Sequence, residues 1–208
     1  MTMLSSAPSS SAPPAGFSDP VQQSQASFRA LLDAMARPGR IASIAGDIGR
    51  PDGVTQALAA AALTLCDLDT PVWLGPGFDT PALKNWLRFH TGAPVVAQAG
   101  AAQFALLNAG QPLPNLENFA QGSDEAPEKG ATLLIQVATL QGKTAMQWRG
   151  PGIKDGVAMP PCGLPMAFWQ QRAALSAAFP RGLDLYLCCS TDLIGLPRST
   201  AITFATEA

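Results

Sequence analysis

Residues 131–140, which read ATLLIQVATL, constrain the fold of this 208-residue chain more than any other segment. The segment is almost continuous in Leu, Ile and Val, so it predicts a strand that is buried on both faces. Helical and extended patterns alternate along the rest of the chain, and we therefore predict a single α/β or mixed α+β domain. The expected helices cover residues 20–37, 54–66, 81–91 and 165–179, and the expected strands cover residues 71–74, 95–96, 104–107, 131–140, 144–149, 183–188 and 192–196.

The first helix has the clearest boundaries. Asp19 is the expected N-cap, with Pro20 at the first helical position and Gln22 placed to complete a capping box. Pro38 and Gly39 follow the helix and should end it. An apolar stripe with spacing i, i+3, i+4 and i+7 should face the core, and its members are Phe28, Leu31, Leu32 and Met35.

Three other patterns carry specific expectations. The turn at residues 141–143 predicts a hairpin between the strands at 131–140 and 144–149. Residues 183–188 alternate between Leu and other residues, which indicates a strand with one buried face. The helix at 54–66 is apolar on nearly all sides, so it lies either in the core or at a subunit interface.

The N-terminal segment differs in composition from the rest of the chain. Residues 1–16 consist mainly of Ser, Ala, Pro and Gly and offer little to bury. We expect a disordered tail there, followed by a domain that covers residues 17–208.

The low charge of the chain excludes several classes of protein. Charged residues make up 13% of it, about half of the roughly 25% that is usual in soluble domains. A pI of about 5.3 without basic blocks argues against a nucleic-acid binder. The apolar run at residues 57–66 is too short to cross a bilayer, and no basic residue precedes Arg29, so no secretory signal is expected. Low charge also suits the centre of a permanent subunit interface.

The four cysteines include no C-x-x-C pair, and we predict reduced thiols in a cytoplasmic protein. Cys188 and Cys189 are adjacent on an expected strand, point to opposite faces and should not bridge each other. We interpret them as small buried hydrophobes rather than as reactive thiols.

Few residues are suited to catalysis, and the most useful candidates are cations. The single histidine, His90, follows Arg88 at the end of an expected helix, where either residue could cap the last carbonyls or contact an anionic substrate. Arg198 precedes Ser199 and Thr200, and these three could form an oxyanion-binding cluster or an exposed end. We therefore keep Arg88, His90 and Arg198 as candidate substrate-binding residues and assign no catalytic residue.

Two other motifs favour turns over chemistry. Asp67 and Asp69 could hold a metal ion, but an Asp-x-Asp-Thr-Pro sequence also suits a turn, and we predict no metal site. The Gly-Pro-Gly sequence at residues 150–152 lacks the surroundings of a phosphate-binding loop. It is more typical of a strand exit.

Several stretches of the chain resemble the PhnH family, a component of the bacterial carbon–phosphorus lyase core complex for phosphonate metabolism. They occur in the order of the family and cover the chain from about residue 19 to its end, except for the segment at 110–127. The strings are FRALLDAMARPG (28–39), LTLCDLDTPVWL (63–74), LRFHTGAPVV (87–96), EKGATLLIQVATL (128–140), RGPGI (149–153), FPRGLDLYLCC (179–189) and LPRST (196–200).

The resemblance implies a fold similar to that of the pyridoxal-phosphate-dependent transferases, without the cofactor and its lysine. It also implies a homodimer that joins subunits G, I and J in a core complex. With subunits G, I and L, the family is associated with the transfer of ribose triphosphate from ATP to an alkylphosphonate, with displacement of adenine. None of the four lysines (Lys84, Lys129, Lys143 and Lys154) lies at an apolar strand end, where burial would favour a Schiff base.

Two functions remain open at this point. The chain is either a structural or co-catalytic subunit of that complex, or a stand-alone transferase-like enzyme that binds a nucleotide or a phosphonate. A working pyridoxal-phosphate enzyme would need a Schiff-base lysine, for which the sequence offers no good candidate.

Overall fold

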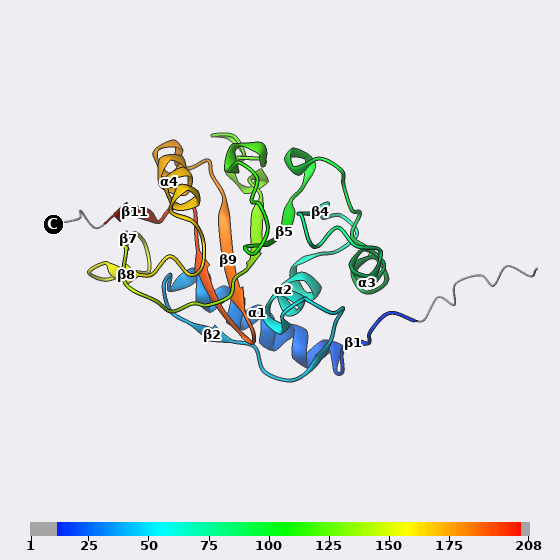
Figure 1. Cartoon of the computed structure of the whole chain (residues 1–208). Coiled ribbons are helices and arrows are strands. Elements are labelled where there is room, and N and C mark those ends of the chain that lie inside the picture. Colours follow the sequence, from blue (N-terminus) through cyan, green and yellow to red (C-terminus); the bar gives the residue numbers. More distant parts are fainter. Residues whose placement is uncertain (1–11, 205–208) are drawn as a thin grey trace, which may run out of the picture.

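A six-stranded mixed sheet forms the centre of the computed structural model, which describes residues 12–204 (Figure 1). Strands β4, β5, β6 and β9 are parallel, whereas β10 pairs antiparallel with both β9 and β2. The prediction of an α/β domain is thereby confirmed. The order across the sheet is β2 (Ala42–Ser43), β10 (Asp192–Leu196), β9 (Asp184–Cys189), β6 (Thr132–Gln136), β5 (Phe104–Asn108) and β4 (Val72–Leu74).

Different elements cover the two faces of this sheet (Figure 1). One face packs against the helices α1 (Pro20–Ala36), α2 (Gln56–Leu65) and α3 (Pro81–Thr91). The other face packs against α4 (Met166–Leu175) and a small antiparallel sheet. That small sheet contains β7 (Met146–Arg149), β8 (Val157–Met159) and β11 (Ala201–Phe204), and a separate pair joins β1 (Gly16–Phe17) to β3 (Ile48–Gly49).

The predicted tail over residues 1–16 lies mostly outside the described residues. Of its last residues, Gly16 belongs to β1 and pairs with Gly49, and the carbonyl of Pro14 accepts a hydrogen bond from the domain. Residues 14–16 therefore lie against the fold, and the expectation of disorder remains a prediction for the residues before them.

Burial on both faces explains the apolar sequence of the central strands. Leu134 of β6 faces the core below α1 and α2, whereas Leu133 and Ile135 face the core below α4. The prediction that residues 183–188 have only one buried face is wrong, because Tyr186 and Cys188 are buried as well. Helix α1 covers that side of β9, and the Tyr186 hydroxyl donates a hydrogen bond of 3.1 Å to the carbonyl of Leu31.

The start of α1 follows the expected capping logic with one difference. Asp19 is the N-cap, and its carboxylate accepts from the backbone N–H of Gln22 at 3.1 Å. The side chain that reaches back is Gln23, whose Oε1 accepts from the N–H of Asp19 at 3.0 Å. The helix ends at Ala36 with Arg37 as C-cap, as Pro38 predicts.

The predicted apolar stripe of α1 is partly wrong. Leu31 is 1% exposed, but Phe28 and Leu32 are 50% and 58% exposed. The helix is oriented so that these two side chains point outward. Its buried face is formed by Leu31 and by two small residues on either side of it, Ser27 and Ala34. Small residues on that face let the helix backbone lie close to the sheet.

The expected hairpin between residues 131–140 and 144–149 does not form. Strand β6 ends at Gln136, and its two neighbours are β5 and β9, so no free edge is left for an antiparallel partner. Strand β7 instead joins β8 and β11 in the small sheet. Both of these partners are short strands that the sequence pattern did not indicate.

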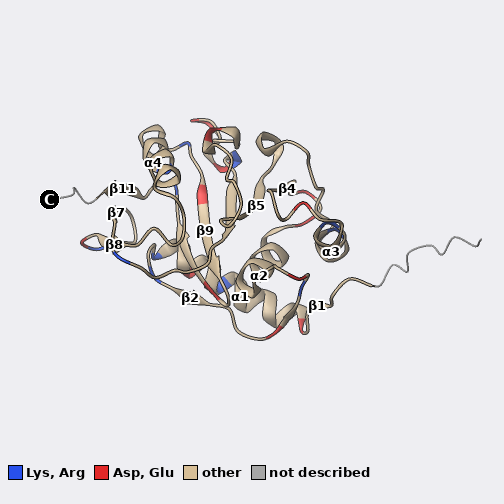
Figure 2. Cartoon of the chain, in the orientation of Figure 1, with Lys and Arg blue, Asp and Glu red and all other residues tan. Residues whose placement is uncertain are grey.

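Helix α2 lies in the core of the domain rather than at its surface. All six residues from 57 to 62 are at most 1% exposed, and the helix carries no charged side chain (Figure 2). The core interpretation of this apolar helix is therefore correct. Within the described residues, none of the helices combines the length and the hydropathy needed to cross a membrane.

Candidate functional site

Helix α3 carries two of the three candidate residues, and its ends fix where they lie. The Thr80 hydroxyl accepts from the N–H of Leu83 at 3.2 Å, and Gly92 ends the helix with a left-handed φ of 73°. The side chains of Leu83, Trp86 and Leu87 are buried, so the face of α3 that carries them packs against the core. Arg88 and the residue one turn earlier, Lys84, then share another face because they are spaced i, i+4.

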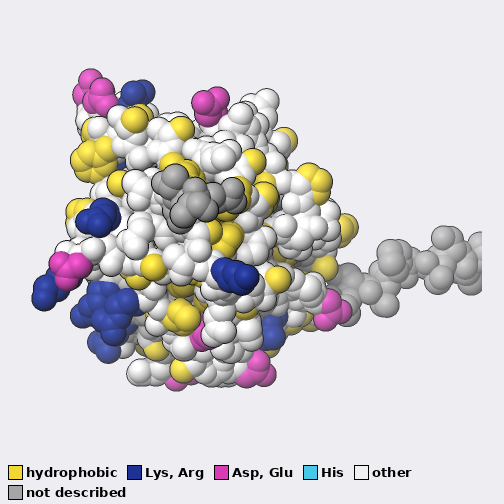
Figure 3. All heavy atoms as spheres, turned by 60° about the vertical axis from the view of Figure 1, so that its left-hand side comes forward, with side chains coloured by type: hydrophobic (Ala, Val, Ile, Leu, Met, Phe, Trp, Pro, Cys, Tyr) yellow, Lys and Arg dark blue, Asp and Glu magenta, His cyan; other side chains and the backbone are white. Residues whose placement is uncertain are grey.

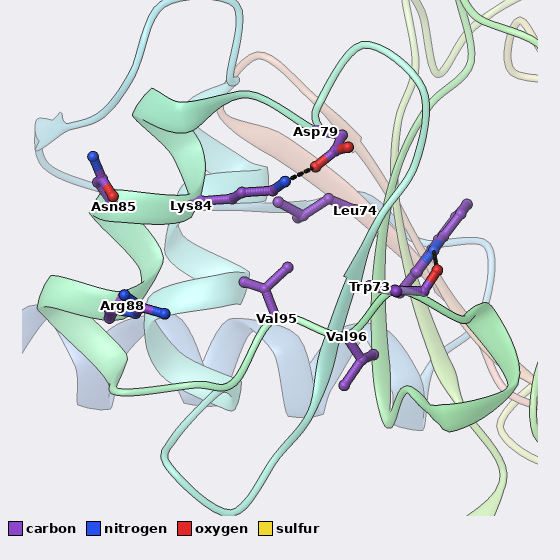
Figure 4. Close-up of a pocket in the computed structure, with 9 residues that line it drawn as sticks. Trp73, Leu74, Asp79, Lys84, Asn85, Arg88, Val95 and Val96 are labelled. Carbon is purple, nitrogen blue, oxygen red and sulfur yellow. Dashed lines mark hydrogen bonds and ion pairs between the residues drawn. The ribbon is translucent and has the colours of Figure 1, made fainter.

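That second face borders a cavity of about 450 Å³ between α3, β4 and the segment at residues 95–97 (Figure 4). The ammonium of Lys84 is paired with the carboxylate of Asp79. The Arg88 side chain extends toward Val95 (Figure 4). The full lining is Trp73, Leu74, Asp79, Lys84, Asn85, Arg88, Val95, Val96 and Ala97.

One wall of this cavity is the outer edge of the six-stranded sheet, because β4 is an edge strand. The N–H of Val72 donates to the carbonyl of Pro94 at 2.8 Å, and the N–H of Val96 donates back to Val72 at 2.9 Å. Hydrogen-bonding directions alternate along a strand, so the backbone of Leu74 points to the same outer side. There the covering segment has already turned away toward Ala97, whose carbonyl accepts from the Trp73 indole at 3.3 Å.

His90 lies on α3 but binds a different part of the chain. Its Nε2 is 2.7 Å from the carbonyl oxygen of Pro14. The ring packs edge-on against Trp86 and Phe89, with centroid distances of 5.3 and 4.9 Å, and it fills the space beside Gly16. In the structure the imidazole thus holds the segment that leads into β1.

Arg198 lies at the other end of the domain, next to the start of β9. The Asp184 carboxylate accepts from the Arg198 backbone N–H at 2.7 Å and from its Nε at 3.1 Å, and it also forms an ion pair with Nη2. Nη1 donates to the carbonyl of Pro127. The arginine side chain is 14% exposed, so the described contacts use most of its hydrogen-bonding capacity.

The structure does not bring the three candidates together. Arg88 borders the cavity at β4, His90 faces the segment before β1, and Arg198 precedes β11 on the opposite side of the molecule (Figure 1). On the side near β7, β8 and β11, hydrophobic side chains are scattered rather than gathered into one patch (Figure 3). Arg88 borders the cavity of about 450 Å³, and His90 borders a smaller one of about 240 Å³ beside Phe17 and Leu63.

Helix α4 contains a buried cation that sequence reasoning placed on the helix but did not recognise as special. Arg172 is 1% exposed, and its Nη2 donates to the carbonyl of Pro197 at 2.8 Å. Burial is the main cause that lowers the pKa of the Arg172 guanidinium to about 10; Asp184 opposes this shift and the nearby Arg198 adds to it. Its contacts with the turn before β11 indicate that it fixes that turn.

The other motifs have structural roles. The N–H of Asp69 donates to the Asp67 carboxylate at 3.0 Å, which confirms the turn. No group of three or more His, Cys, Asp or Glu in residues 12–204 is arranged to hold a metal ion. Gly152 has φ of 81°, and a Cβ there would clash with the carbonyl oxygen of Ala36, so the Gly-Pro-Gly sequence is a tight turn against the end of α1.

The cysteines are free thiols, and three of the four are buried. Burial raises the pKa of Cys66 and Cys162 to about 12 and raises that of Cys188 further. These groups are therefore protonated near neutral pH and are poor nucleophiles. Cys189 is more exposed, and its Sγ lies 3.4 Å from the carbonyl oxygen of Ala138.

A second cavity, of about 540 Å³, lies where β6 and β9 end beside the start of α2. Its central polar side chain is already bonded at both ends. The Gln136 Oε1 accepts from the N–H of Thr55 at 2.8 Å, and the Gln136 Nε2 donates to the carbonyl of Gly53 at 2.9 Å. These bonds tie β6 to the residues before α2, so the Gln136 side chain is occupied by the fold itself.

The cavity beside Arg88 was not predicted as a whole. Lys84 and Arg88 share an i, i+4 spacing that is visible in the sequence. The apolar wall comes from residues 73–74 and 95–97, which are brought opposite α3 only by the folded chain. The pair of cations one helical turn apart, Lys84 and Arg88, is therefore the sequence signal that could have indicated the face of α3 that borders the cavity.

Comparisons with known proteins extend over nearly the whole described chain. Residues 15–203 match the family model described as bacterial phosphonate metabolism protein (PhnH). A protein of Rhizobium meliloti (strain 1021), named alpha-D-ribose 1-methylphosphonate 5-triphosphate synthase subunit PhnH, is 41% identical over 186 residues, which are 89% of this chain and 93% of that protein. A protein of Stutzerimonas stutzeri, named putative C-P lyase subunit protein HtxG, is 30% identical over 178 residues, which are 86% and 85% of the two chains.

These matches agree with the family resemblance that the sequence strings indicated. They also show that the similarity extends over the α/β domain as a whole. The match begins just before β1 and ends within β11, so it includes both cores, α3 and the segment that leads to Arg198. The chain belongs to the PhnH family of bacterial phosphonate metabolism proteins.

Proposed function

We propose that this chain is a subunit of an enzyme complex that makes α-D-ribose 1-methylphosphonate 5-triphosphate in phosphonate metabolism. The observation that carries this proposal is the 41% identity to the Rhizobium synthase subunit over 93% of its length. The reaction implied by the family resemblance is the transfer of ribose triphosphate from ATP to an alkylphosphonate, with adenine as the leaving group. We assign this chain a structural or co-catalytic role in it.

The dispersal of the candidate residues supports a role within a complex. Arg88, His90 and Arg198 lie in three separate places, and the two latter side chains are engaged by the fold itself. A nucleoside triphosphate needs several cations that converge on its phosphates. At the cavity beside Arg88 the second cation, Lys84, is paired with Asp79, and His90 borders a separate cavity, so partner subunits would have to supply further cations.

We further propose that the fold is related to that of the pyridoxal-phosphate-dependent transferases and works without their cofactor. The mixed sheet with helices on both faces supports the relation. The lysines do not suit the cofactor, because a Schiff-base lysine needs burial to lower its pKa. Lys84 is paired with Asp79, and the other three lysines are exposed, namely Lys129, Lys143 and Lys154.

The partners that we propose are a second copy of the chain and subunits G, I and J. An exposed apolar stripe supports the need for partners. Val21, Phe28 and Leu32 lie on one face of α1 and are 76%, 50% and 58% exposed. Side chains of this kind at helical spacing are typical of a surface that is covered in an assembly.

Co-expression with candidate G, I and J subunits tests the proposal. Size-exclusion chromatography of the purified chain should show a stable complex that contains all partners, and the complex should form ribose 1-methylphosphonate 5-triphosphate from ATP and methylphosphonate. Leu32→Glu places a charge on the α1 stripe and should reduce assembly. Leu68→Glu is the matched control, since Leu68 is 71% exposed and lies outside α1. Failure of the unaltered chain to co-elute with any partner would contradict the proposal.

The alternative is a stand-alone enzyme that binds a nucleotide or a phosphonate. The cavity beside Arg88 is the observation that favours it. This alternative requires that the isolated chain turn over ATP and methylphosphonate without partners. It also requires that the isolated chain bind ATP or a phosphonate and that His90→Ala and Arg88→Ala abolish this binding.

A further inference from the structure

The charge balance of the cavity between α3 and β4 is the first observation that points to a ligand. Lys84 and Asp79 neutralise each other in an ion pair. Arg88 is exposed and forms no ion pair or side-chain hydrogen bond with the part of the chain that the structure describes. The cavity lining therefore carries one net positive charge, and the guanidinium that carries it is open to a ligand.

The second observation is the apolar wall that faces this charge. Leu74 and Val95 lie across the cavity from Lys84 and Arg88 (Figure 4). Trp73 and Val96 also border the cavity, but their side chains turn away from Leu74 and Val95 (Figure 4), and the Trp73 ring packs against Phe119. Apolar side chains with a few polar groups that fix orientation are the usual composition of small-molecule sites, which have volumes of about 300–1,000 Å³. The cavity, at about 450 Å³, lies in this range.

The third observation is the free backbone of the edge strand. The N–H and C=O of Leu74 face the outer side of β4, where neither is bonded to another backbone group of the described chain. Both groups lie beside the cavity rather than in the hydrogen-bonded interior of the sheet. They can orient a ligand by one donor and one acceptor.

We propose that this cavity binds a small organic anion. Its oxyanion lies at the Arg88 guanidinium, next to the Lys84–Asp79 pair, and its short apolar part lies against Leu74 and Val95. A carboxylate and a phosphonate share this chemistry, since both present oxygens that a guanidinium binds through two parallel hydrogen bonds. The inference goes beyond the proposed function, because it assigns a ligand site to this subunit and holds whether or not the complex assembles.

The test follows the cavity residues by NMR in the isolated full-length chain, with the Leu74 amide and the Trp73 indole N–H as reporters. The probes are n-butyrate, n-butylphosphonate, inorganic phosphate and n-butanol. Both butyl anions should shift the two reporters with a Kd near or below about 1 mM. Inorganic phosphate should bind about tenfold more weakly, because it lacks the apolar part, and butanol should cause no saturable shift.

Two variants separate the contributions of charge and apolar contact. Arg88→Gln should weaken both butyl anions about tenfold, the effect of losing one charge-assisted contact, whereas the matched control Arg29→Gln removes an exposed charge from α1 and should change nothing. Val95→Thr should weaken the butyl anions about threefold, the effect of one lost methyl contact, without affecting phosphate.

Three results would overturn the proposal. They are the absence of reporter shifts with either butyl anion, equal affinity for phosphate and butylphosphonate, and shifts that persist unchanged in Arg88→Gln. None of these results bears on co-purification with partner subunits, so failure of this inference and failure of the proposed function are distinguishable.

Discussion

Gly195 in the middle of β10 should be the position where the addition of one methyl group disturbs the domain most directly. Its backbone lies outside the left-handed region, so alanine adds no conformational strain. A Cβ there would lie 2.6 Å from both the carbonyl carbon and oxygen of Ala34 and 2.8 Å from the N atom of Met35, whereas ordinary contact needs at least 3.4 Å. Gly195→Ala therefore requires that α1 and β10 separate by several tenths of an ångström.

The cost of this separation follows from the contacts that it disturbs. Overpacking of a closed core by one methyl group costs about 1–3 kcal/mol. The hydrogen bond from the Tyr186 hydroxyl to the carbonyl of Leu31 joins α1 to β9, and its loss costs about 1 kcal/mol more. We expect Gly195→Ala to lower the free energy of unfolding by about 2–4 kcal/mol, and each kcal/mol lowers the Tm by about 2–4 °C in a domain of this size.

Urea unfolding followed by tryptophan fluorescence measures this effect. Gly110→Ala is the control, because Gly110 is exposed and a Cβ there would meet only the side chain of Asn108 within contact range; its change should stay within about 0.5 kcal/mol. Ala34→Gly should not rescue Gly195→Ala, because the close atoms belong to the backbone of Ala34. Equal stability of Gly195→Ala and Gly110→Ala, or rescue by Ala34→Gly, would refute the reasoning.

Three further predictions concern the candidate cations and the buried thiols. His90→Ala should speed hydrogen exchange and proteolysis of residues 12–17, because it removes the bond to Pro14; unchanged protection would contradict this role. Arg198→Ala should destabilise the domain by about 2–3 kcal/mol in urea, since it leaves the part-buried Asp184 carboxylate unpaired, and Arg198→Lys should recover only part of this loss because lysine lacks the two-pronged geometry. Burial raises the pKa of Cys66 from 9.0 to about 12, so its contribution to stability is complete below pH 9 and is lost as the pH rises toward 12, where the unfolded chain has released a proton that the folded chain keeps. The urea midpoint should therefore fall above pH 9, and less steeply in Cys66→Ala; parallel pH profiles of the two proteins would speak against it.

The sequence predicted the helix that carries Arg88 and His90, but it did not predict the contacts of His90 and Arg198. The boundaries of α3 were predictable, because Thr80, Pro81 and Gly92 act through neighbours within one turn. The partners of Arg198 and His90 were not, because Asp184 and Pro14 lie far from them in the chain. An arginine next to Ser199 and Thr200 suggested either an oxyanion-binding cluster or an exposed end, and in the folded chain this arginine binds the internal carboxylate of Asp184.

The errors in strand prediction have a common cause. Residues 131–140 and 144–149 are close in sequence, and a turn between them made a hairpin the economical interpretation. Pairing is decided by which edges remain free in the assembled sheet, and both edges of β6 are occupied by β5 and β9. In the same way, the second buried face of β9 depends on the arrival of α1, whose sequence lies about 150 residues earlier.

By itself the sequence determined the features that act over short distances. An α/β domain with helices at these positions follows from the apolar run of β6, the all-apolar surface of α2 and the caps of α1 and α3. The sequence strings shared with the PhnH family indicated which family the chain belongs to. Tertiary structure alone decided which face of α1 is buried, where β7 pairs and where each of the three candidate cations lies. The reason is physical: helix caps and hydrophobic periodicity depend on neighbours within a few residues, whereas edge pairing, close approach and ion pairing depend on groups that folding brings together from distant parts of the chain.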